Sequence, residues 1–246
     1  MEVLALIAME PPESFQAEAV RSEKLKVWHS IAAIPLQHAI RGQYGPGTIE
    51  GKQVVGYRQE DRVSPESGTE TFAEVRIEIA NWRWAAVPFY LRTGKRLAKR
   101  FTEARIIFKS SPTQLFKQNS AIGEAEPNVI TLRIQPDDGI CLQFGVKPPG
   151  LTTDLCNVAM RFRYEDAFGK SSANGYERLL LDAMLGDATL FSHHDGVEAT
   201  WAHFTPILDA WAKDADASFP NYSAGSWGPG NVARPFGDGP LCDSSK

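Results

Sequence analysis

The chain is poor in cysteine, has no excess of positive charge and contains no long apolar run. Only three of its 246 residues are cysteines, and none of them forms a Cys-x-x-Cys pair. This usage argues against a disulfide framework or a zinc site and favours reduced thiols in a cytoplasmic protein. The formal net charge of −4 argues against a nucleic-acid or membrane-surface partner. No apolar stretch approaches the roughly 20 residues that a membrane-spanning helix needs.

Two chemical signatures are also missing. No Gly-x-Gly-x-x-Gly segment occurs, so the chain has no dinucleotide-binding fingerprint of its own. The triplet His193-His194-Asp195 suggests a metal site, but no further His or Cys lies at ligand spacing. We interpret Asp195 as the N-cap of the helix that follows, and we predict no metal site.

The N-terminal residues 1–12, MEVLALIAMEPP, predict a buried helix that Pro11-Pro12 ends. No basic residue precedes the apolar run, so a signal peptide is not expected. No N-cap residue precedes it either. We therefore expect that the helix has lost its first turns and that the chain is the rear part of something longer.

An apolar fraction of 43% is enough for a globular protein with a substantial core. Residues 13–34 have the pattern of an amphipathic helix, and helices are predicted again over 175–187 and 196–214. Residues 41–61 are rich in glycine and predict an irregular loop, as do the Gly-, Pro- and Ser-rich residues from 219 onward.

Between these helices, apolar and polar residues alternate with a period of two, which indicates half-buried strands. Short polar connections join the strands, including the hairpin signal Asp137-Asp138-Gly139, so the sheet is predicted to be antiparallel. The fold class is α+β, with a large, mainly antiparallel sheet covered on one face by helices. Strands are expected within residues 70–84, 104–109, 128–136, 139–147 and 158–166, with another ending near Arg92.

The most unusual segment is VPFYLRTGKRLAKR, residues 87–100, which is strongly basic in an acidic chain. Thr93-Gly94 should end a strand, which leaves Lys95 to Arg100 as a connection at one end of the sheet. A lysine supplies a point charge and an arginine a planar fork of donors, so the segment suits a phosphate. By charge count alone, a solvated turn is the favoured interpretation.

Two neighbouring features are less specific. Gln135 precedes Pro136 at the end of a predicted strand, where its amide suits either a sugar hydroxyl or the solvent. Glu103 and Arg105 are interpreted as a cross-strand charge pair.

The chain resembles the C-terminal domain of the glucose-6-phosphate dehydrogenase family. The resemblance covers about residues 2–230, so we assign residues 1–230 to this domain and 231–246 to an irregular tail unlike the family's usual ending. The strings that carry it are LALIAMEPP, AVRSEKLKV, RGQYGPG, RTGK, VITLRIQPDDGI, YERLLLDAMLGDATLF and FPNYSAGSWGP.

The resemblance implies that Lys95 and Arg100 contact glucose 6-phosphate and that Gln135 lies near this substrate. It also implies an oxidoreductase of carbohydrate metabolism. The intact enzyme would oxidise glucose 6-phosphate to 6-phosphoglucono-lactone with NADP, in the pentose phosphate pathway.

The same resemblance identifies motifs that this chain does not contain. Members of the family have an N-terminal dinucleotide-binding half and an Asp-His-Tyr-Leu-Gly-Lys motif. Their general base is a histidine that would fall about two positions before Met1. We therefore assign no catalytic residue here, expect NADP to be bound mainly by the missing half, and expect the isolated chain to be inactive. The alternative is a non-catalytic sugar-phosphate-binding or dimerisation module.

Some members of the family hold a second, structural NADP on this domain. Arg92, Arg105 and Arg133 match basic positions of that site, but this chain departs from it at Phe101, Cys141 and Gln143. These departures argue against a structural NADP here. The family also implies a homodimer or homotetramer through the open face of the sheet, for which the candidate residues are Ala73, Leu91 and Ile107.

Overall fold

The computed structural model describes residues 1–110, 127–150, 155–169, 175–214, 218–230 and 232. The chain forms two compact units. The first unit comprises Met1–Lys99 and Gly175–Asp238, and the second comprises Arg100–Asn174 and Gly239–Lys246. The junction at Lys99 and Arg100 therefore falls within the basic segment.

The first unit contains the helices that the sequence predicts. Each helix starts or ends within a few residues of its predicted limits, where tertiary contacts decide the boundary. They are α1 (Glu2–Ala8), α2 (Ala17–His29), α4 (Gly175–Leu185) and α5 (His194–Lys213).

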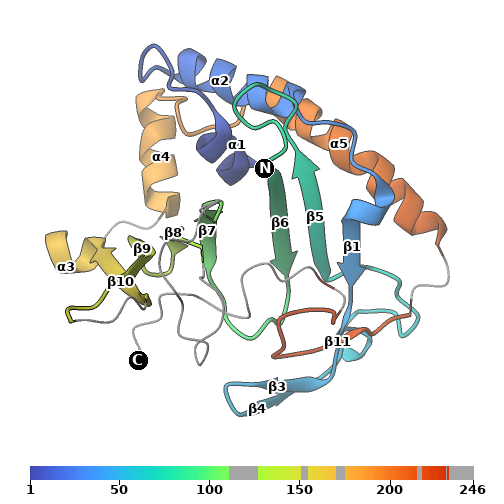
Figure 1. Cartoon of the computed structure of the whole chain (residues 1–246). Helices are drawn as coiled ribbons and strands as arrows, with labels where there is room; N and C mark the ends of the chain where they lie inside the picture. Colours follow the sequence, from blue (N-terminus) through green and yellow to red (C-terminus); the bar gives the residue numbers. More distant parts are fainter. Residues whose placement is uncertain (111–126, 151–154, 170–174, 215–217, 231, 233–246) are drawn as a thin grey trace. The chain divides into compact units, whose positions relative to one another are not determined.

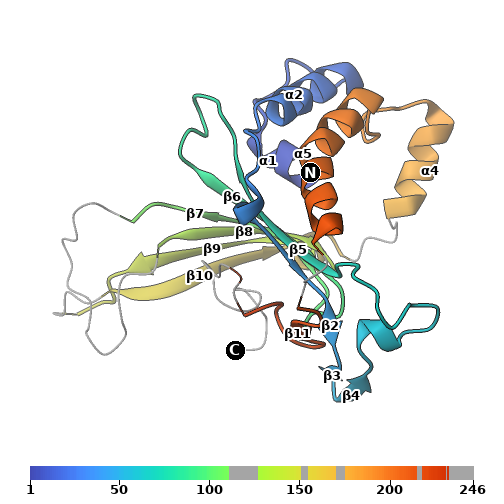
Figure 2. The ribbon, with the colours of Figure 1, turned by 90° about the vertical axis from the view of Figure 1, so that its right-hand side faces the viewer.

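Three strands of the first unit pair as an antiparallel sheet in the order β1-β5-β6. They are β1 (Ala39–Gly42), β5 (Phe72–Glu78) and β6 (Pro88–Gly94). Helices α1, α2 and α5 lie together on one face of this sheet (Figures 1 and 2). Because side chains alternate along β5, Val75 and Ile77 face the helices, and Ile77 is fully buried.

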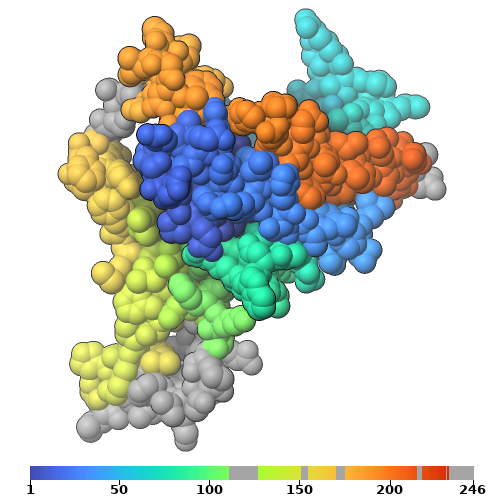
Figure 3. Space-filling view, turned by 90° about the horizontal axis from the view of Figure 1, so that it is seen from above, coloured from blue at the N-terminus to red at the C-terminus, as the bar shows by residue number. Residues whose placement is uncertain are grey.

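Side chains from the helices complete this core. Leu4 of α1, Trp28 of α2 and Trp211 of α5 are all less than 10% exposed and belong to one cluster with β5. In the space-filling view the blue atoms of the first helices adjoin the orange atoms of α5 (Figure 3). Ala73 and Leu91 pack against the same cluster. The expectation that these two residues lie on an open face is therefore wrong.

The glycine-rich residues 41–61, predicted as a loop, instead contain short strands. One of them owes its pairing to a distant partner: β2 (Tyr44–Gly45) runs parallel to β11 (Tyr222–Ser223), which belongs to the C-terminal segment that was predicted to be irregular. A second core forms around Tyr44, Phe72 and Tyr222. The remaining short elements are η1 (Leu36–His38), β3 (Gly47–Ile49), β4 (Lys52–Val54) and η2 (Tyr57–Gln59).

The second unit contains a four-stranded antiparallel sheet in the order β10-β9-β8-β7. The strand register places apolar residues opposite one another, for example Leu132 opposite Ile140 and Phe162 opposite Ile140. One face is therefore apolar across all four strands. The elements are β7 (Thr102–Ile107), β8 (Val129–Gln135), β9 (Gly139–Val146), β10 (Cys156–Arg163) and the short helix α3 (Tyr164–Phe168).

The predicted α+β class is confirmed, with antiparallel sheets and with helices on one face of the sheet of the first unit.

The expectation of reduced thiols is wrong for Cys141, which is buried and disulfide-bonded. Cys156, at the start of β10, is a free and exposed thiol. None of the described helices is both long and apolar enough to cross a membrane.

Candidate functional site

Lys95 lies in a tight turn that follows β6 in the first unit. The strand runs to Gly94, slightly further than predicted, and the backbone N–H of Lys95 donates to the Thr71 carbonyl oxygen at 2.8 Å. Gly94 is required because a Cβ there would lie 2.8 Å from the ring of Phe72. The next residue, Arg96, has a left-handed backbone with φ of 53°. This conformation turns the chain sharply and leaves Lys95 at an exposed corner.

The two cations of this turn have different surroundings. Arg96 is paired, with its Nη2 lying 3.0 Å from Oε1 of Glu60, and the Tyr44 hydroxyl donates to the same oxygen at 3.0 Å. These hydrogen bonds from Arg96 and Tyr44 hold the pKa of the Glu60 carboxyl below its usual value. The Lys95 ammonium has neither an ion-pair partner nor a hydrogen bond among the described residues. Of the two side chains, Lys95 is therefore the one available to an anion.

Arg100 and Gln135 belong to the second unit, where the register brings them to one end of the sheet. Gln135 is the last residue of β8 and pairs with Thr102 of β7, two residues after Arg100. Both side chains are exposed. The structure thus brings Arg100 and Gln135 to the same sheet end, while Lys95 lies in the other unit.

The charge pair beside Arg100 differs from the predicted one. Glu103 and Arg105 form an ion pair, but both lie on β7, two residues apart and on one face of it. The prediction of a cross-strand pair is therefore wrong. The residue opposite Glu103 across the strands is Arg133 of β8.

Two of the arginines that match positions of the family's structural NADP site form ion pairs with glutamates of this chain. Arg92 of β6 donates from Nε to Oε2 of Glu74 at 2.6 Å, and the Glu74 side chain is only 4% exposed. Arg105 is similarly paired with Glu103, and its own side chain is 11% exposed. Binding a nucleotide phosphate through these groups would require the guanidinium to exchange a carboxylate for the phosphate.

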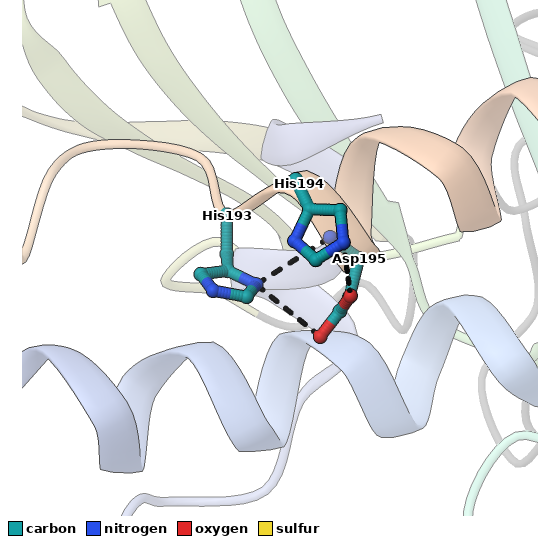
Figure 4. A group of neighbouring side chains, drawn as sticks. All are labelled: His193, His194 and Asp195. Atoms are coloured by element: carbon teal, nitrogen blue, oxygen red, sulfur yellow. Dashed lines mark hydrogen bonds and ion pairs between the residues drawn. The ribbon is translucent and has the colours of Figure 1, made fainter.

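His193, His194 and Asp195 converge at the first turn of α5 (Figure 4). One ligand-type atom from each lies within 4.8 Å of the others, and all three residues are exposed. The N-cap of α5 is His193 rather than Asp195, because its Nδ1 accepts from the backbone N–H of Asp195 at 3.4 Å. Nδ1 of His193 also lies 3.3 Å from the Asp195 carboxylate. The grouping is thus the N-terminal cap of α5, in which Nε2 of His194 also lies 3.0 Å from the Asp195 carboxylate.

A small cavity of about 50 Å³ lies beside this cap, between α2 and the start of α5. Its lining includes Glu18, Arg21 and Trp28 of α2 together with His193 and Asp195. A space of this size holds a few water molecules, whereas ligand sites usually measure several hundred Å³. The cavity therefore does not suit a hexose phosphate.

The fold thus defines an α+β domain built on antiparallel sheets, with exposed cations after β6 and before β7. Residues 1–237 match the family model described as "Glucose-6-phosphate dehydrogenase, C-terminal domain". The chain belongs to this family.

Individual relatives agree with the family model. The glucose-6-phosphate 1-dehydrogenase of Chlamydia pneumoniae is 46% identical over 231 residues, which make up 93% of this chain and 45% of that protein. A solved glucose-6-phosphate dehydrogenase in complex with its substrate glucose 6-phosphate superposes with a TM-score of 0.81 at 32% identity, over 94% of this chain and 46% of that one. The enzyme from Mycobacterium avium gives a TM-score of 0.73 at 34% identity, over 93% and 45%. The chain therefore spans about half the length of the relatives it matches.

Sequence reasoning missed the residues that hold the Lys95 turn. Thr71 and Tyr222 lie 24 and 127 positions from Lys95, and both form hydrogen bonds to its backbone. Tyr222 belongs to FPNYSAGSWGP, one of the strings that carry the family resemblance, but the resemblance implies no function for this tyrosine. No local pattern around Lys95 points to either residue.

Proposed function

We propose that the chain is the substrate-binding C-terminal half of a glucose-6-phosphate dehydrogenase. The intact protein would oxidise glucose 6-phosphate to 6-phosphoglucono-lactone and reduce NADP. Family membership supports this proposal. The observation that carries it in this chain is Lys95, an exposed ammonium without a partner among the described residues, on a turn whose backbone is held by hydrogen bonds.

In this proposal Lys95 and Arg100 neutralise the phosphate dianion. Lysine offers one compact charge, and arginine offers two parallel donors to two phosphate oxygens. Gln135, at the same sheet end as Arg100, would hydrogen-bond a sugar hydroxyl through its amide. Together these contacts would orient the sugar so that its reacting carbon meets the cofactor.

The redox step itself would require groups beyond these residues. NADP supplies the hydride acceptor, and a general base must remove a hydroxyl proton as the hydride leaves. The resemblance places both the base and the main NADP site in a half of the enzyme that this sequence does not contain. We therefore expect the 246-residue chain alone to bind the sugar phosphate weakly and to form no NADPH.

The second unit supports a further part of the proposal, association through the sheet into a homodimer or homotetramer. The apolar face of the four-stranded sheet includes exposed Ile140, Met160 and Phe162. Large contiguous apolar patches are uncommon on monomers and mark interaction surfaces.

Calorimetric titration with glucose 6-phosphate tests the binding role. We compare the wild-type chain with Lys95→Ala, Arg100→Ala and the control Lys52→Ala, which removes an exposed lysine from β4. Loss of one charge-assisted contact, worth about 1.5–3 kcal/mol, should weaken binding roughly tenfold or more in the first two variants only. Equal affinity in all four proteins, or no wild-type binding at about 10 mM, would contradict the proposal.

A further inference from the structure

The backbone of Lys95 is held at both of its peptide groups. Its N–H donates to the Thr71 carbonyl oxygen at 2.8 Å, and its own carbonyl oxygen accepts from the Tyr222 hydroxyl at 2.9 Å. The Cα of Lys95 therefore lies between two anchors that come from distant parts of the chain. By contrast, its ammonium is exposed and unpaired among the described residues.

Tyr222 is itself fixed in place. It is 6% exposed, and its ring packs edge-to-face against Phe72 at 5.8 Å and against Tyr44 at 6.3 Å between ring centroids. Its hydroxyl lies 3.0 Å from Oγ1 of Thr71, which also accepts from the backbone N–H of Tyr44 at 3.1 Å. When the Thr71 hydroxyl donates to Tyr222, the tyrosine proton is left for two carbonyl oxygens, that of Lys95 at 2.9 Å and, more distant, that of Thr71 at 3.3 Å. Hydrogen bonds linked in this way strengthen one another.

The segment around Tyr222 also binds the residues that follow Lys95. The N–H of Gly225 donates to the carbonyl oxygen of Arg96 at 2.8 Å, and the N–H of Ala98 donates to the carbonyl oxygen of Ser226 at 2.9 Å. Gly225 has φ of 84°, and a Cβ there would lie 2.0 Å from the carbonyl oxygen of Thr48. Residues 222–226 thus follow the turn closely and join it at three points.

We infer that Tyr222 is a positioning residue for the phosphate-binding lysine. Its hydroxyl fixes the carbonyl of Lys95, so that the ammonium is presented to the sugar phosphate from a rigid turn. A lysine side chain that starts from a fixed Cα loses less conformational freedom when it binds than one on a mobile loop. This inference rests on the proposed role of Lys95 and assigns a role to the C-terminal segment.

The test is a double-mutant cycle on the full 246-residue chain, read by calorimetric titration with glucose 6-phosphate and with inorganic phosphate. Tyr222→Phe keeps the ring in the core and removes only the hydroxyl. Its affinity for both ligands should fall about fivefold to tenfold, which corresponds to about 1–1.4 kcal/mol. Tyr57→Phe is the matched control: its ring lies 5.8 Å from that of Tyr44 in the same core, but its hydroxyl does not contact Lys95. Its affinity should equal that of the wild type.

The second arm of the cycle separates positioning from a general effect on folding. In the Lys95→Ala background, Tyr222→Phe should cause no further loss of affinity, because the group that it positions is gone. An equal loss in both backgrounds, or unchanged affinity on the wild-type background, would overturn the inference. If Lys95→Ala alone changes nothing, it is the proposed function that fails.

If Tyr222→Phe does not fold, a second variant, Thr71→Ala, tests the same inference. Thr71→Ala leaves the tyrosine ring in place and removes the hydroxyl that orients its proton. This variant should weaken binding by a smaller factor, about twofold to fivefold, and only when Lys95 is present. Wild-type affinity in Thr71→Ala would count against the positioning role.

Discussion

At the residue scale, the buried Tyr222 hydroxyl links stability to alkaline pH. Burial is the largest cause that raises the pKa of Tyr222 above its ordinary value of about 10, although the hydrogen bond with Thr71 acts in the opposite direction. The folded state thus retains a proton that the unfolded state loses first. The stability that depends on this proton is complete below about pH 10 and is lost as the pH rises through the folded-state pKa.

We expect the melting temperature of the wild-type chain to fall above about pH 10, and that of Tyr222→Phe to fall less steeply. Some decline should remain in the variant, because burial raises the pKa of Tyr44 as well. Thermal unfolding followed by circular dichroism between about pH 8 and 11.5 measures both slopes. Identical slopes in the two proteins would show that Tyr222 ionises equally easily in both states.

A second residue-scale prediction concerns Lys24, a lysine that is only 5% exposed on α2. Its Nζ lies 2.9 Å from Oε2 of Glu2 on α1, so the pair joins the two helices. Glu2→Ala would leave a buried ammonium without its carboxylate, and we expect a loss of about 1–3 kcal/mol in the free energy of unfolding. The matched control is Glu23→Ala, which breaks an ion pair with the exposed Lys26. Urea unfolding should show a loss of about 0.5 kcal/mol or less for this control, and equal losses would refute the distinction.

At the element scale, the contact between α2 and α5 depends on a residue without a side chain. A Cβ on Gly196 would lie 2.2 Å from Cζ3 of Trp28, and this ring is 3% exposed in the core. Gly196→Ala should therefore push the helices apart and destabilise the chain by about 1–3 kcal/mol, despite the higher helix propensity of alanine. In Gly68→Ala the new methyl group meets no atom within 4 Å, so this control should be neutral within about 0.5 kcal/mol. Denaturant midpoints compare the two, and a stable Gly196→Ala would show that α5 can shift freely.

A comparison of individual strands shows which of them can be predicted from the local sequence pattern. Strand β5 is evident from its sequence because Val75 and Ile77 alternate with charged residues and meet the helices on one face. Strand β2 is not evident, because it is two residues long and pairs with β11 about 180 residues later. Short strands of this kind depend on tertiary contacts more than on their own propensity. The same holds for the cap of α5, where a histidine took the place expected of Asp195.

In the candidate site, too, some residues can be predicted from the sequence and others cannot. A charged segment and a family resemblance predict Lys95, Arg100 and Gln135 as substrate-binding residues. In the structure Lys95 is exposed, and Arg100 lies at the same end of the sheet as Gln135. Tyr222 could not be identified, since a hydrogen bond to the carbonyl of residue 95 leaves no trace in the local sequence. Basic composition predicts that a charge is available, whereas the fold determines how firmly that charge is held.

At the scale of the whole molecule, association should depend on one face of the four-stranded sheet. Met160 on the edge strand β10 is 63% exposed and lies opposite Leu142, on the face that also includes Ile140 and Phe162. If this face meets a second copy of the chain, Met160→Asp would place a charge in an apolar interface and favour the monomer. Desolvating a carboxylate without a partner costs several kcal/mol, which is enough to dissociate a micromolar dimer.

Sedimentation equilibrium at micromolar concentration should therefore show dimers or tetramers for the wild type and monomers for Met160→Asp. The matched control is Ala159→Asp, whose side chain is also exposed but points to the opposite face of the same strand. This control should keep the wild-type mass, because its charge remains in water. A monomeric wild type would exclude association of the chain through this sheet. Dissociation by both variants would mean that net charge, rather than the apolar face, governs assembly.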